Sequence, residues 1–299
     1  YLKMKKNLFF LLITFVISIV NAQDIQINWG PEYKNESNKL ISFVSYGGHT
    51  SKAYYVVERS LKTASLSIYN FNFNRIANQE IQLTYGKSAI TPLDIINTKS
   101  GNYYILGGYD RKDKTSQIYY TNFTPSNTLN TNYKSIVEFP CNINDAVSLF
   151  NPQSEIFLTS RESYVNSVEK SVNKNSLFSV SYDSTKVLIP YTSSTNSNDN
   201  VVLSYLVLDD KMNKVFDKKI SLSYQKKNFK VLDNFVMDNG DIYVTAKHYE
   251  NDKDRATPNY KFYIIKMNEK EQKNIELKLS NAAPLNANVL NLNNGNIII

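Results

Sequence analysis

Cysteine and histidine are the scarcest reactive residues in this chain. Its 299 residues include one cysteine, Cys141, and two histidines, His49 and His248. A single cysteine excludes a disulfide framework and a cysteine-rich metal site, and two histidines are too few for most zinc chemistry. We therefore predict no metal and no cofactor, and we expect Cys141 to be a small apolar core residue.

Glycine and proline are also few, at 9 and 8, and helical periodicity is nearly absent. Hydrophobic residues make up 42% of the chain and charged residues 20%, which is ordinary for a globular protein and excludes extensive disorder. The apolar runs are short, rich in β-branched and aromatic residues, and separated by Asn, Asp, Ser and Gly. This pattern is typical of β-strands and predicts an all-β fold.

The first 22 residues have the order of a secretory signal peptide. A basic pair at 5–6 precedes an apolar run over 8–20, and small or tolerated residues follow up to Ala22. We predict cleavage between Ala22 and Gln23, and export to the periplasm, the cell surface or the medium. The alternative, an uncleaved membrane anchor, ranks second because a span needs about 20 apolar residues.

Removing the signal weakens the basic character of the chain. Residues 1–22 hold three lysines and no acids, so the mature part carries 31 basic and 27 acidic side chains, a net charge of +4. Nucleic-acid binding needs a concentrated basic face with interleaved aromatic residues. The richest basic positions, 218–219 and 226–227, are flanked by strand residues. The sequence therefore predicts no nucleic-acid partner.

A tight turn followed by an apolar run recurs along the mature chain. It occurs at 99–102, 238–241 and 293–296, and without glycine at 183–186. Asn-Gly turns reach positive φ at little cost and match the twist of a two-stranded hairpin. The spacing from position 185 to Gly240 is 55 residues, and the spacing from Gly240 to Gly295 is the same.

Two further apolar runs follow each turn, so each unit has four predicted strands. Four antiparallel strands every 45–55 residues is the period of a β-propeller blade. We place units at about 40–86, 92–140, 176–225 and 229–280, a partial unit at 286–299, and an irregular stretch at 141–175. The prediction is one β-propeller over 23–299. The alternative is two β-sandwich domains divided near 141–175.

Both ends of the sequence lead us to expect a fragment of a longer gene. Three residues precede Met4, and the chain stops at 297–299, where a second strand of the last unit begins. An unpaired apolar strand at the edge of a sheet promotes aggregation. We therefore expect the propeller to be truncated at its C-terminus.

Three features carry a resemblance to a group of uncharacterised secreted bacterial proteins with a propeller-like fold. They are the segment Asn21-Ala22-Gln23, the Asn-Gly hairpins, and the link 258–261 into a third strand. The resemblance covers about the whole mature chain and implies the fold and export. It implies no activity and no catalytic residue.

The segments that partly match catalytic or metal-binding motifs are interpreted as structural elements. Asp238-Asn239-Gly240 with Tyr243 matches part of the sialidase-type hairpin, but Val236 stands at the serine position, so we interpret it as a plain turn. Gly107-Gly108 is expected to end a strand. The acids at 250–254 lack the glycine and the distal glutamate of a calcium loop. No catalytic residue is predicted.

Tyrosine pairs at 54–55, 103–104 and 119–120 place one ring on each face of their strands. Such rings stack on sugars, pack against partners, or simply cover half-buried sheet faces. Our leading prediction is an exported, non-enzymatic binding or scaffold protein that holds a glycan or a protein on a blade-end face. The alternatives are a propeller glycosidase or polysaccharide lyase, with carboxylates at the central channel, and a structural component of a cell-envelope assembly.

Overall fold

The computed structural model describes part of the chain. The residues are 40–46, 53–59, 64–124, 131–142, 145–146, 149–150, 178–193, 196, 198–250, 260–278, 290–291 and 297–298. All of them belong to Asn35–Ile299, one of two units into which the chain divides. The predicted signal peptide, the cleavage position between Ala22 and Gln23, and most of the stretch 141–175 lie outside these residues.

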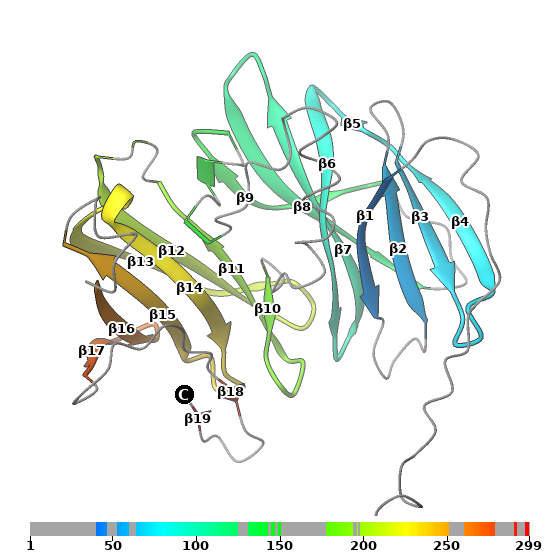
Figure 1. Cartoon of the computed structure of the whole chain (residues 1–299). Coiled ribbons are helices and arrows are strands. Elements are labelled where there is room, and N and C mark those ends of the chain that lie inside the picture. The colour runs from blue at the N-terminus through cyan, green and yellow to red at the C-terminus, as the bar shows by residue number, and fades with distance from the viewer. Residues whose placement is uncertain are drawn as a thin grey trace, which may run out of the picture. The chain divides into compact units, whose positions relative to one another are not determined.

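The first two sheets are antiparallel meanders in which each strand pairs with the next along the chain (Figure 1). Sheet A consists of β1 (Leu40–Tyr46), β2 (Tyr54–Arg59), β3 (Ala64–Tyr69) and β4 (Arg75–Ile81). Sheet B consists of β5 (Thr84–Tyr85), β6 (Ser88–Thr98), β7 (Gly101–Asp110), β8 (Thr115–Phe123) and β9 (Lys134–Phe139).

The next two sheets repeat this plan. Sheet C consists of β10 (Ser179–Val180), β11 (Lys186–Tyr191), β12 (Asn200–Asp209) and β13 (Lys214–Gln225). A 3-10 turn, η2 (Lys226–Asn228), leads into sheet D, which consists of β14 (Phe229–Val236), β15 (Ile242–Tyr249), β16 (Tyr260–Met267) and β17 (Gln272–Leu277). The short strands β18 (Leu290–Asn291) and β19 (Ile297–Ile298) pair with each other.

Successive residues of β7 enter two different hydrophobic cores. Tyr104 and Leu106 pack in a core shared with sheet A, whereas Tyr103 and Ile105 pack in a core shared with sheet C. Since side chains alternate across a strand, sheet B is buried on both faces. Each fully buried Leu or Ile stabilises the fold by roughly 1.5–3 kcal/mol.

Sheet C is covered in the same way. Leu206 and Leu208 of β12 belong to the core shared with sheet B, and Leu203, Tyr205 and Val207 belong to a core shared with sheet D. In a pair of sandwich domains each sheet would bury one face. Two consecutive sheets buried on both faces instead form the stack expected of propeller blades, and the predicted all-β class is confirmed.

The first strands of consecutive sheets also lie against one another. β1 contacts β6, β6 contacts β10, and β10 contacts β14. In a propeller the first strand of every blade lies next to the axis, so contacts of this kind are expected between neighbouring blades.

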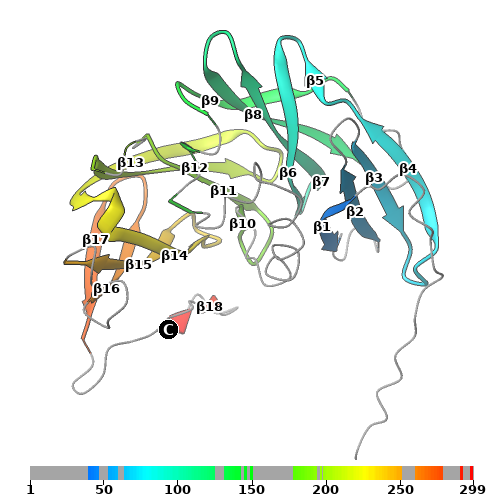
Figure 2. The ribbon, with the colours of Figure 1, turned by 45° about the horizontal axis from the view of Figure 1, so that its top comes forward.

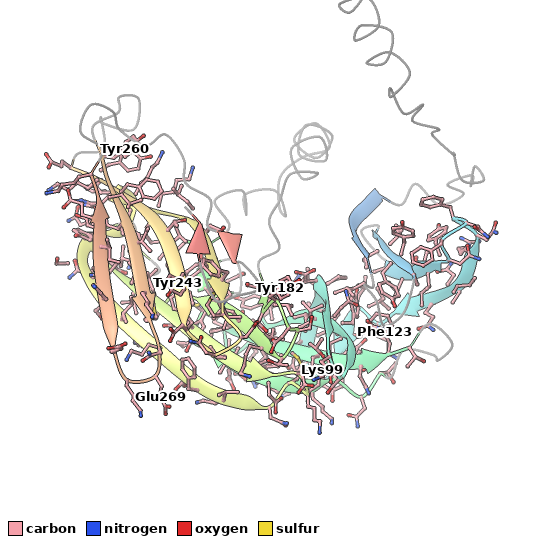
Figure 3. The ribbon with its side chains drawn as sticks, turned by 90° about the horizontal axis from the view of Figure 1, so that it is seen from below. Lys99, Phe123, Tyr182, Tyr243, Tyr260 and Glu269 are labelled. Atoms are coloured by element: carbon pink, nitrogen blue, oxygen red, sulfur yellow. The ribbon has the colours of Figure 1, made fainter. Side chains whose placement is uncertain are left out.

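The β6–β7, β10–β11 and β14–β15 turns of sheets B, C and D are joined by hydrogen bonds. The N–H of Lys99 donates to the carbonyl of Ser184 at 2.8 Å, and the N–H of Asp183 donates to Oδ1 of Asp238 at 3.0 Å. In Figure 3, Lys99 and Tyr182 mark the first two of these turns. The turn that the sequence analysis interpreted as plain, at Asp238, therefore also connects two sheets.

Sheet B departs from four strands because of one short addition. Thr84–Tyr85, which the sequence analysis assigned to the first unit, pairs with the start of β6 (Figure 2). Gly107 and Gly108 lie within β7 and do not end it, contrary to expectation. A Cβ on Gly108 would lie 2.5 Å from Cε2 of Tyr119, so the strand requires a glycine there for packing.

Candidate functional site

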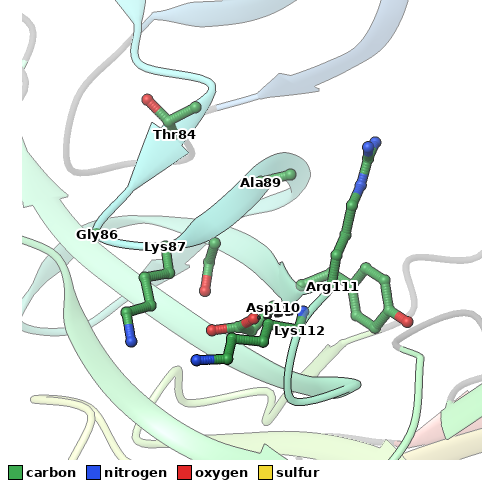
Figure 4. A pocket seen from close by; sticks show the side chains of 9 residues that line it. Thr84, Gly86, Lys87, Ala89, Asp110, Arg111 and Lys112 are labelled. Carbon is green, nitrogen blue, oxygen red and sulfur yellow. Dashed lines mark hydrogen bonds between the residues drawn. The ribbon is translucent and has the colours of Figure 1, made fainter.

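A hollow of about 420 Å³ lies at one end of sheet B, between the β5–β6 turn and the β7–β8 turn (Figure 4). The two turns meet because the start of β6 pairs with the end of β7, with Ala89 opposite Tyr109. The polar and charged residues that line it include Thr84, Lys87, Ser88, Tyr109, Arg111 and Lys112.

The β5–β6 hairpin is a tight turn with a firm anchor. Gly86 has a φ of 58°, a left-handed conformation that favours glycine. The hydroxyl of Tyr85 donates to the carbonyl of Tyr133 at 3.2 Å, and the Tyr85 ring lies 5.5 Å from the Tyr119 ring. These contacts fix the hairpin against the body of sheet B, so Lys87 projects from a rigid base.

The β7–β8 turn is fixed by the side chain of Asp110. Its Oδ1 accepts the N–H of Lys112 at 2.8 Å and the N–H of Asp113 at 3.2 Å. Such turns satisfy backbone donors locally and leave the side chains of the turn residues outside. Arg111 and Lys112 are accordingly exposed.

The hollow carries more positive than negative charge. Lys87, Arg111 and Lys112 are cationic, and Asp110 is the one acid among the residues that line it. Among the described residues, none of these three cations forms an ion pair or a side-chain hydrogen bond, whereas Lys266 pairs with Asp241 at 2.9 Å. In Figure 4, Lys87 and Lys112 point to the same side and Arg111 points away from them.

The sequence analysis missed this site. Tyr85-Gly86-Lys87-Ser88 and the segment 110–113 were both recognisable as turn sequences with basic residues. The signal that could have located the site is that the two turns bracket two strands that pair with each other. Two basic turns in that arrangement lie at the same end of a sheet.

The two histidines singled out from the sequence are not brought together. His49 lies outside the described residues. His248, at the end of β15, stacks on Tyr224 of sheet C with a ring-centroid distance of 4.0 Å. Burial lowers the pKa of His248, Lys261 lowers it further, and Glu250 opposes both.

The tyrosine pairs divide between faces as predicted. Tyr55, Tyr104 and Tyr119 enter the core between sheets A and B. Tyr103 belongs to the core between sheets B and C, and Tyr120 packs against it. Because both faces of sheet B are covered, the tyrosine pairs at 103–104 and 119–120 serve packing.

The structure describes Cys141 but only the first residue of the acidic loop at 250–254. Cys141 is half buried against the core between sheets B and C. The acidic loop considered for calcium lies outside the described residues beyond Glu250. Within the part of the chain that the structure describes, there is no cluster of three metal-ligating side chains. The same part contains no helix long and apolar enough to cross a membrane.

Comparison with known proteins gives similarity only at the level of coarse shape. No family model matches the chain, and no curated protein matches its sequence. A luciferin-regenerating enzyme aligns with a TM-score of 0.36 and 10% identity, covering 81% of this chain and 62% of that one. A mutant of the Synechocystis apocarotenoid oxygenase aligns with a TM-score of 0.37 and 10% identity, covering 78% and 47%. The chain thus spans less than two thirds of either protein, and these likenesses carry no argument about activity.

Proposed function

We propose that this chain is an exported, non-enzymatic binding protein that holds a glycan or another protein at the end of sheet B. The observation that carries the proposal is the hollow lined by three cations on two hydrogen-bonded turns, and none of these cations forms an ion pair with another residue that the structure describes. Turns that are fixed before binding lose little conformational entropy when a ligand arrives, which favours affinity.

The exposure of the hollow favours binding over catalysis. Thr84, Lys87, Arg111 and Lys112 are all exposed, so a bound molecule would remain in contact with water. Enzymes that cleave glycosidic bonds place paired carboxyl groups around the scissile bond, and the lining of this hollow contains one carboxylate, which accepts hydrogen bonds within its own turn.

The test is retention of soluble polysaccharides by the immobilised mature chain, beginning at Gln23, with reducing ends measured in parallel. We expect retention without release of reducing ends, and loss of retention in the double variant Lys87→Ala/Lys112→Ala. Retention that the double variant leaves unchanged would place binding elsewhere. Release of reducing ends would instead support an enzyme.

One observation favours a glycosidase as the second candidate. Asp94 of β6 and Asp233 of β14 occupy equivalent irregularities in the first strands of their sheets, where each carboxylate accepts the N–H of the next residue. Burial raises the pKa of Asp233, although the N–H of Asn234 opposes this. A carboxyl with a raised pKa suits a general acid. Hydrolysis that Asp233→Asn abolishes would establish this candidate.

A further inference from the structure

The charge of the hollow identifies a class of ligand, on the premise that the proposed function is correct. We propose that the hollow binds an acidic glycan, a sugar chain that carries carboxylate or sulfate groups. Both groups present oxygen atoms with negative charge, which is the chemistry that lysine ammonium groups recognise.

The first argument is the balance of charge. The lining residues carry three cations and one acid, a local excess of two positive charges. Oδ1 of Asp110 already accepts two backbone N–H groups, so one oxygen of that carboxylate is committed to the turn. None of the three cations has a partner among the described residues, so an anion would supply their first ionic contact.

The second argument is the direction in which the side chains of the three cations point. Lys87 and Lys112 come from different turns, line the same hollow, and point to the same side in Figure 4. Arg111 points away, so we expect it to contribute less. The two turns set the backbone positions of both lysines before a ligand binds, and the exposed lysine side chains can adjust to it.

The third argument separates a glycan from an acidic protein. A volume of about 420 Å³ lies within the range of small-ligand sites, roughly 300–1,000 Å³. A stable protein partner would instead cover about 800 Å² of each surface. The hydroxyls of Thr84 and Ser88 and the ring of Tyr109 line the same hollow, and they suit the hydroxyl groups and apolar faces of sugar rings.

The experiment is a calorimetric titration of the mature chain with four probes. These are an oligogalacturonate, a heparin oligosaccharide, a neutral maltooligosaccharide and a poly-glutamate peptide. We expect one or both acidic saccharides to bind. We also expect the affinity to fall between about 0.05 M and about 0.3 M ionic strength, because salt screens exposed charges.

Variants locate the binding. Lys87→Ala/Lys112→Ala should weaken binding about tenfold or more, since contacts to charged groups contribute on this order. The matched control is Lys211→Ala, because Lys211 has the same turn position in sheet C, with its N–H donating to Oδ1 of Asp209 at 2.9 Å. The control should change affinity less than about twofold. Thermal unfolding of each variant verifies that the fold is retained.

The outcomes separate this inference from the proposed function. Equal binding of the neutral saccharide, lost in the double variant, would keep the binding function and overturn the acidic-glycan assignment. Binding of poly-glutamate without either acidic saccharide would replace the glycan with an acidic peptide. An equal loss in Lys211→Ala would show nonspecific attraction and overturn the site. Binding of none of the probes would overturn the acidic-glycan assignment, and the retention test of the mature chain would then decide the proposed function by itself.

Discussion

The β7–β8 turn of sheet B and the β12–β13 turn of sheet C share one backbone hydrogen bond to an aspartate and have different uses. In sheet B, Asp110 accepts the N–H of Lys112 at 2.8 Å. In sheet C, Asp209 accepts the N–H of Lys211 at 2.9 Å. The aspartate of each turn therefore fixes a lysine two residues later in the chain.

The side chains of the two turns separate their roles. The third residue after the aspartate is exposed Asp113 in sheet B and Met212, only 4% exposed, in sheet C. The carbonyl of Asp210 also accepts the hydroxyl of Thr98 from sheet B at 2.7 Å. Two turns that share one aspartate bond thus differ in role: the turn of sheet C joins two sheets, and the turn of sheet B borders an open hollow. The side chains of the turn residues decide between these roles.

The largest predicted effect is on stability at the buried turn. Met212→Ala should lower the free energy of unfolding by about 2–4 kcal/mol, because it leaves a cavity in the core between sheets B and C. Urea unfolding measures the change. The equivalent Asp113→Ala should stay within about 0.5 kcal/mol of the wild type. Equal losses in both variants would show that the two turns are not distinguished by packing.

A smaller effect is predicted for the hydrogen bond between the sheets. Thr98→Val keeps the shape of the side chain and removes the hydroxyl that reaches Asp210, which should cost about 1–2 kcal/mol. Thr84→Val, at the exposed rim of the hollow, is the matched control and should change stability by less than about 0.5 kcal/mol. An unchanged urea midpoint for Thr98→Val would mean that water replaces the lost bond.

The smallest predicted effect is a pH dependence at Asp209. Burial pushes the pKa of Asp209 upward, but hydrogen bonds from Asn213 and Lys211 outweigh it and hold the pKa below its usual value. A lowered carboxyl pKa stabilises the fold above the unfolded value of about 4, and this contribution is lost as the pH falls through the folded value. The stability difference between wild type and Asp209→Asn should therefore shrink from about pH 5 to about pH 2. Urea midpoints measure it, with Asp113→Asn controlling for the lost charge.

The local part of the fold was accessible from the sequence, and the interfaces between sheets were not. Gly240, with a φ of 88°, forms the hairpin that its Asp-Asn-Gly context predicts. The fourth strand of the first sheet, Arg75–Ile81, lies within the predicted unit 40–86, but its mostly exposed polar residues give little periodic signal that would place its ends. The bond from Asp183 to Asp238 joins different sheets, so local propensity gives no indication of it.

The candidate site was not predicted because its residues have ordinary roles on their own. The sequence around Lys87 and around Lys112 indicates only a solvated lysine in a turn. The pairing of β6 with β7 places both residues around one hollow. The sequence shows Gly108 as part of a glycine pair. The requirement for glycine there comes from the ring of Tyr119 on the neighbouring strand. Such contacts depend on strand register, which single residue types do not specify.

The hydrogen-bonded first turns have a consequence for how such a chain could change in evolution. The turn of sheet C accepts an N–H from Lys99 at Ser184 and donates one from Asp183 to Asp238, 55 residues further on. The turn of sheet C therefore carries an acceptor for sheet B and a donor for sheet D. A tandem duplication of the sheet C segment would place a turn with a donor beside a turn with an acceptor at the new junction, so the gene could gain a blade from an interface that it already encodes.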